Sequence, residues 1–72
     1  MTSEEQAKAR KELGNKFSTA REKVKLTQQQ VADAAGVHVN FYARVERGLE
    51  NPSFEKMQGI MKVLGIKSLD LF

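Results

Sequence analysis

A single glycine interrupts an otherwise helical pattern in the middle of this chain. Residues 34–48 read AAGVHVNFYARVERG, and the glycine is Gly36. Apolar residues precede it at helical spacing, and the same spacing resumes after it at Phe41 and Val45. Because glycine adopts a positive φ at little cost, it can end one helix and let the chain turn at once. The sequence therefore predicts two short helices joined by a tight turn, within about residues 27–47.

Capping residues predict where the first two helices begin. Ser3 with Gln6 reads as a capping box for a first helix that ends at about Lys23. Thr27 with Gln30 reads as the capping box of the second helix. The residues of the first helix expected to face the core share helical spacing, and they are Leu13, Phe17, Ala20 and Val24.

The C-terminal part of the chain predicts two further helices. Asn51 precedes Pro52, which disfavours a helix there, so we expect a loop. Ser53 is expected to cap a fourth helix, and Ser68 a short fifth. The inward residues expected on the fourth helix are Phe54, Met57, Ile60, Met61 and Leu64. No long run alternates with period two, so the prediction is an all-α domain of five helices without a sheet.

Composition excludes several classes of protein. The 72 residues suffice for one small domain. The chain has no cysteine, which excludes a disulfide framework and suits a reducing cytoplasm, where we expect the protein. No stretch approaches the roughly 18 apolar residues of a membrane span. The N-terminal residues carry no apolar signal region, so we expect no membrane association.

Catalysis and cofactor binding are not indicated. The sequence offers no nucleophile–base pair and no glycine-rich phosphate loop. Its single histidine, His38, cannot form a common metal site without cysteines. We therefore expect no enzyme, no metal, no cofactor and no small-molecule ligand.

The third predicted helix has a polar face suited to DNA. Asn40, Arg44 and Arg47 are spaced so that they share the face opposite the core. Arginine can fork onto guanine and asparagine onto adenine in the major groove. Residues 27–51 hold only two arginines against three acids, whereas residues 1–26 hold seven lysines and arginines against four acids. The basic first segment should therefore help to attract phosphates.

The stretch LTQQQVADAAGVHVNFYARVERGLENPS, residues 26–53, together with KVLGI, residues 62–66, resembles the DNA-binding domain of the Xre/Cro/lambda-repressor family. It is similar in style to restriction–modification controller proteins and phage repressors. The resemblance covers about residues 13–72 and implies a compact five-helix, lambda-repressor-like fold with a helix-turn-helix. Residues 1–12 would then be a charged, partly helical extension.

The resemblance also implies roles for individual residues. The implied base-contacting residues are His38, Val39, Asn40 and Arg44. The implied phosphate-contacting residues are Thr27, Gln28, Gln29, Arg47, Asn51 and Ser53. A structural ion pair is implied between Arg21 and Glu46. An apolar C-terminal surface is expected to form a dimer interface through Ile66, Leu69, Leu71 and Phe72.

The chain departs from the family pattern at two positions, Lys25 and Val39. Lys25 stands where the family often has a glycine, at a position that can need a positive φ. Val39 can touch a thymine methyl but forms no hydrogen bond to a base. Direct readout would therefore rest on Asn40 and Arg44.

The resulting interpretation is a sequence-specific regulator of transcription that binds double-stranded DNA. It would act as a homodimer on a near-palindromic operator, with residues 38–47 in the major groove. One alternative is the DNA-binding module of a longer repressor or antitoxin. A second alternative is a protein–protein adaptor of the same fold, such as a coactivator, which needs no base readout.

Overall fold

A computed structural model describes residues 2–67 and shows an all-α arrangement. Its four helices are α1 (Ser3–Lys23), α2 (Gln28–Ala35), α3 (Val39–Glu46) and α4 (Phe54–Leu64). The residues from 2 to 67 form no strand, which confirms the all-α prediction. The fifth helix predicted after Ser68 lies outside the described residues.

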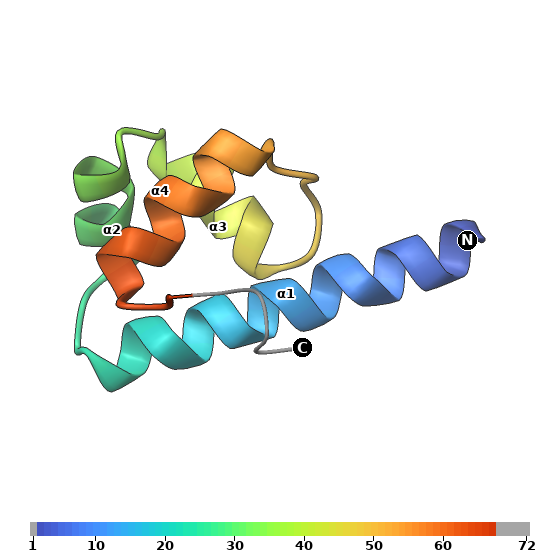
Figure 1. Cartoon of the computed structure of the whole chain (residues 1–72), viewed down its shortest axis with the longest axis horizontal. Helices are drawn as coiled ribbons and strands as arrows, with labels where there is room; N and C mark the ends of the chain where they lie inside the picture. The colour runs from blue at the N-terminus through green and yellow to red at the C-terminus, as the bar shows by residue number, and fades with distance from the viewer. Residues whose placement is uncertain (1, 68–72) are drawn as a thin grey trace.

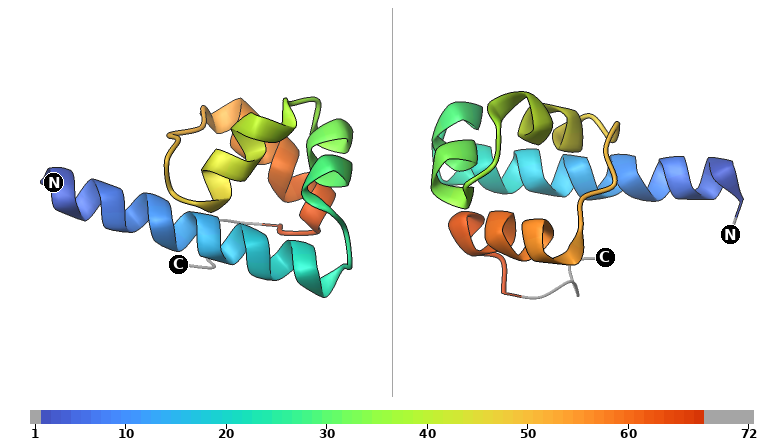
Figure 2. Two further views of the ribbon diagram at one scale, coloured as in Figure 1. Left: turned by 180° about the vertical axis from the view of Figure 1, so that it is seen from behind. Right: turned by 90° about the horizontal axis from the view of Figure 1, so that it is seen from above.

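The four helices pack around one core. Helix α1 packs against α3 and α4, and α2 packs against the same two helices. Viewed from above, α3 and α4 lie on opposite sides of the line of α1 (Figure 2). The first turns of α1 project beyond the other three helices (Figure 1). Across residues 2–67, no helix combines the length and apolarity needed to cross a bilayer.

Helix α1 begins one residue earlier than expected. Thr2 is the N-cap, and its hydroxyl accepts a hydrogen bond of 3.1 Å from the backbone N–H of Glu5. The predicted capping box of Ser3 with Gln6 is therefore wrong, because Ser3 already has helical geometry. The hydroxyl of Thr2 also donates to Oε1 of Glu5 at 3.1 Å, and Glu4 and Glu5 lie in the first turn, where the helix dipole favours acids.

Helix α1 runs without interruption through Gly14, and this glycine lets α3 approach closely. A Cβ atom at this position would lie 2.5 Å from the carbonyl oxygen of Val45 and 2.7 Å from the carbonyl carbon of Glu46. A second close approach follows at Gly48, where a Cβ atom would lie 2.8 Å from the Cα of Lys11. These two glycines seat the end of α3 directly on α1.

The remaining caps agree with the sequence prediction. The hydroxyl of Thr27 accepts from the N–H of Gln30 at 3.0 Å, and the side chain of Gln30 accepts from the N–H of Thr27 at 2.8 Å. Gly36 ends α2 with φ of 73°. Ser53 caps α4 by accepting from the N–H of Lys56 at 3.2 Å. Lys25 has φ of 60°, as the comparison with the family pattern anticipated.

The core contains most of the apolar residues expected to face inward. Its buried members are Leu13, Phe17, Val31, Ala32, Tyr42, Val45, Ile60, Met61 and Leu64. Two predicted core residues are exposed instead, which corrects the prediction for Phe54 and Val24. Phe54 is 61% exposed because it opens α4, where burial begins only at Met57. Val24 follows the last residue of α1, so its side chain no longer lies on the packed face of the helix.

Candidate nucleic-acid interface

The polar face of α3 points away from the core. Asn40 and Arg44 are exposed, whereas Tyr42 and Val45 on the opposite side are fully buried. Arg47 is the C-cap of the helix and is also exposed. The three polar residues predicted to share one face therefore lie together on the solvent side of α3.

The first two predicted base-contacting residues form the start of α3. His38 is the N-cap, and its Nδ1 atom accepts a hydrogen bond of 3.1 Å from the backbone N–H of Asn40. In the neutral ring with Nδ1 as acceptor, the proton lies on Nε2, which is then a donor. Val39 is the first residue of the helix and is half-buried. Nowhere in residues 2–67 do three or more histidines, cysteines or acids cluster in a way that could hold a metal ion.

Arg44 forms an ion pair that the sequence did not predict. Its Nε atom donates to Oε2 of Glu50 at 2.8 Å, across the turn that follows α3. The side chains of Arg44 and Glu50 are 50% and 32% exposed. The pair therefore holds the guanidinium of Arg44 at the surface, beside a carboxylate that repels phosphate.

A buried network ties α1, α2 and α3 together. Nε of Arg21 donates to Oε2 of Glu46 at 2.6 Å, and a second guanidinium nitrogen donates to Oε1 at 3.3 Å. A third bond runs from Arg21 to the carbonyl oxygen of Leu26 at 3.0 Å. The structure thus forms the ion pair that the family resemblance implied.

Gln28, a predicted phosphate contact, is the third member of this network. Its Nε2 atom donates to Oε1 of Glu46 at 2.9 Å. An amide nitrogen has two hydrogens, so one donor of Gln28 remains for a further acceptor. The sequence pattern did not reveal this bond, because the two residues are 18 positions apart.

The pKa values of the network follow from its geometry. Burial alone would raise the pKa of Glu46, but the hydrogen bond from Arg21, the nearby hydroxyl of Tyr42 and the hydrogen bond from Gln28 outweigh it and hold that pKa below its usual range. The same hydrogen bond with Glu46 raises the pKa of Arg21. Both side chains are therefore charged at neutral pH.

Tyr42 lies beside this network with its hydroxyl oxygen buried. No residue in the described part of the chain gives that oxygen a hydrogen bond of normal geometry. Burial, reinforced by the nearby carboxylate of Glu46, strongly raises the pKa of Tyr42. Tyr42 is therefore a neutral core residue and does not stack on bases.

The start of α2 carries two more of the predicted phosphate contacts. Thr27 is exposed, but its hydroxyl oxygen is already the acceptor of the capping bond. The side-chain amide of Gln29 donates to Oδ1 of Asp33 at 2.8 Å, one turn along the helix. A phosphate could still accept hydrogen bonds from the hydroxyl of Thr27 and from the second amide hydrogen of Gln29.

The loop after α3 carries two further predicted phosphate contacts. Asn51 and Ser53 are exposed on either side of the buried Pro52. Phe41, on α3, is half-buried, and the Nζ atom of Lys56 lies 4.7 Å from the centre of its ring. This contact joins α3 to the first turn of α4 across the loop.

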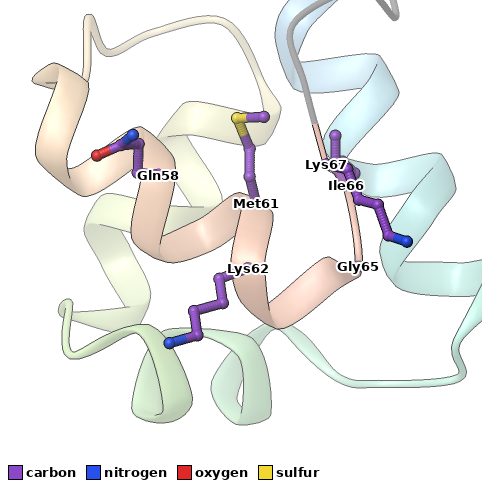
Figure 3. Close-up of a pocket in the computed structure, with 6 residues that line it drawn as sticks. All are labelled: Gln58, Met61, Lys62, Gly65, Ile66 and Lys67. Atoms are coloured by element: carbon purple, nitrogen blue, oxygen red, sulfur yellow. The ribbon is translucent and has the colours of Figure 1, made fainter.

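The predicted dimer surface is described only at Ile66, since Leu69, Leu71 and Phe72 lie outside the described residues. Ile66 is half-buried and packs against the core. It borders a surface hollow of about 590 Å³, whose lining residues from α4 and the following segment are shown in Figure 3. These lining residues are Gln58, Met61, Lys62, Gly65, Ile66 and Lys67.

Comparison with known proteins finds a matching family. A model of the family described as Helix-turn-helix matches residues 18–72, which is most of the chain. No curated protein and no solved structure matches.

Proposed function

Because this chain belongs to the helix-turn-helix family of the Cro/C1, Xre-like type, we propose that α2 and α3 are its helix-turn-helix and that α3 enters the major groove of double-stranded DNA. The observation that carries the proposal is the exposed face of α3. Asn40 and Arg44 stand on that face, and the opposite side is fixed in the core by Tyr42 and Val45. A rigid helix that presents hydrogen-bonding side chains suits direct readout of base edges.

Within this proposal, the residues at the start and on the outer face of α3 read bases. Asn40 would pair with adenine and Arg44 with guanine, the pairings that their side-chain geometry favours. Val39 would contact a thymine methyl, and the free Nε2 of His38 would donate to a base or a phosphate. Arg44 must first leave Glu50, which stands 2.8 Å away in the free protein.

Phosphate contacts would come from both sides of α3. The start of α2 supplies Thr27, Gln28 and Gln29, and the loop after α3 supplies Asn51 and Ser53. Arg47, exposed at the end of α3, would join the second group. Contacts of this kind fix register on the duplex but carry no sequence information.

The proposed biological role is regulation of transcription by a homodimer on a near-palindromic operator. Two recognition helices would then lie about 34 Å apart, one turn of DNA. The dimer contact is proposed to include Ile66, which borders an open hollow on the surface. Residues 13–72 would form the DNA-binding domain, with residues 1–12 as its helical extension.

The experiment that tests this function is selection of binding sites from randomised duplex DNA by the purified protein. We expect enrichment of a two-fold-symmetric sequence whose half-sites are one helical turn apart. Enrichment of an asymmetric site would support base readout but contradict the proposed homodimer. No enrichment by a folded protein would contradict DNA reading and leave the adaptor role as the better account of the fold.

A further inference from the structure

The first turns of α1 lie outside the part of the chain that matches the family, which begins at residue 18. In Figures 1 and 2 these turns extend beyond the point where the end of α3 lies against α1. The backbone of Lys11 meets Gly48, so closely that only a glycine fits there. Helix α1 is therefore seated on the loop that carries the proposed phosphate contacts.

A small surface hollow marks this junction. It has a volume of about 250 Å³ and is lined by Gln6, Ala9 and Arg10 from α1 and by Asn51 from the loop. Its lining contains a cation and two amides but no acid. A site with this composition is complementary to an anion.

Arg10 is distinguished from its neighbours by burial. It is half-buried, whereas the other residues between 2 and 12 are exposed. Partial burial of this kind is typical of an arginine whose aliphatic stem lies along protein surface, and Arg10 is one of the residues that line the hollow. The ion pairs found within residues 2–67 join Arg21 to Glu46 and Arg44 to Glu50, so Arg10 has no carboxylate partner there.

We propose that Arg10 and Asn51 together bind one phosphate of the DNA backbone. The inference rests on the proposed function and adds to it a contact from outside the matched domain. The guanidinium would supply a forked, charged pair of donors, and the amide of Asn51 would supply a third donor. The close contact of Lys11 with Gly48 fixes the position of α1 relative to the loop, so the side chains of Arg10 and Asn51 meet the same phosphate.

The test compares Arg10→Gln with Lys8→Gln. Both substitutions remove one positive charge from the first turns of α1. The two residues are about 200° apart around the helix, so only one of them faces the hollow. Affinity is measured by titration of the duplex recovered from selection, and of a duplex of unrelated sequence, over a range of salt concentrations.

We expect Arg10→Gln to weaken binding to both duplexes by about tenfold, as for a hydrogen bond to a charged group. The slope of log affinity against log salt should fall in magnitude by about 0.9, the value for one phosphate contact. Lys8→Gln should change affinity by less than about twofold and leave the slope unaltered. Arg10→Lys should restore the slope, which a purely structural role of Arg10 would not predict.

A double variant tests whether the two residues share a phosphate. Asn51→Ala combined with Arg10→Gln should weaken binding by less than the product of the single effects. Equal affinities and slopes for Arg10→Gln and Lys8→Gln, in a protein that binds DNA, would overturn this inference alone. If the unmodified protein binds neither duplex, the proposed function fails and the inference falls with it.

Discussion

Nε of Arg21 donates a hydrogen bond of 2.6 Å to the carboxylate of Glu46, and so joins the end of α1 to the end of α3. The Glu46 side chain is only 6% exposed, which makes this contact very different from a surface ion pair. Gln28 donates to the same carboxylate from the start of α2. One buried acid therefore sets the relative positions of the three helices that would contact DNA.

Replacing Glu46 with alanine should strongly destabilise the protein. The guanidinium of Arg21 would be left partly buried without its carboxylate, which typically costs about 3–5 kcal/mol. Urea denaturation gives the free energy of unfolding. Glu12→Ala, at an exposed position of α1, is the control and should change it by less than about 0.5 kcal/mol. An unaltered midpoint for Glu46→Ala would mean that the network contributes nothing to stability.

The same carboxylate should make stability depend on pH. The pKa of Glu46 is lower in the folded protein than its ordinary value of 4.5. A group of this kind stabilises the fold above its unfolded pKa, and the contribution is lost as pH falls toward the folded pKa. The free energy of unfolding should therefore decrease below about pH 4.5. In Glu46→Gln, which cannot ionise, the decrease should be shallower, and identical pH profiles would contradict the assignment.

Gly14→Ala should destabilise the protein although alanine favours helices. The new methyl group would lie 2.5 Å from the carbonyl oxygen of Val45, so α1 and α3 would have to separate. Overpacking of this kind costs about 1–3 kcal/mol. Gly59→Ala is the matched control, because its methyl group would meet only the carbonyl oxygen of Ala35, at 3.6 Å.

The Gly59→Ala control should be neutral or raise stability by up to about 1 kcal/mol, since alanine is the better helix former. Thermal unfolding followed by circular dichroism measures both variants. If the two glycines respond alike, the close approach at Gly14 does not constrain the packing of α1 on α3.

Arg44→Ala should weaken binding to the selected duplex and change its specificity. Loss of a forked contact with guanine costs about 1–3 kcal/mol and relaxes the preference at one base pair. Lys8→Ala removes the same charge from an exposed position in the first turns of α1 and is the control. Equal weakening on all sequences would reassign Arg44 to a phosphate.

Glu50→Gln should strengthen DNA binding. The substitution frees Arg44 from an ion pair of 2.8 Å and removes a negative charge that phosphates would meet. Exposed pairs contribute about 0.2–1 kcal/mol, so we expect a gain of a few-fold in affinity at most. Glu55→Gln, an exposed acid in the first turn of α4, is the control. The part of the gain that comes from freeing Arg44 should disappear in the Arg44→Ala background, and a loss of affinity would show that Glu50 positions Arg44 productively.

The sequence by itself determined the local structure. The capping box of Thr27 with Gln30, the positive φ at Gly36 and the cap at Ser53 are all found where the sequence predicts them. Each depends on hydrogen bonds or dihedral preferences within about four residues. The polar face of α3 follows from helical spacing for the same reason.

Apart from the pair of Arg21 with Glu46, which the family resemblance implied, only the tertiary structure decided which side chains meet. Gly14 lies inside a helix, where glycine is unfavourable on its own. It is needed there only because the backbone of α3 approaches so closely. The bond from Gln28 to Glu46 spans 18 positions, and the pair of Arg44 with Glu50 crosses a turn. The first of these depends on how α2 and α3 cross, and the second on the path of the turn that follows α3. The sequence therefore specified the helices and the polar face, and packing determined how that face is held.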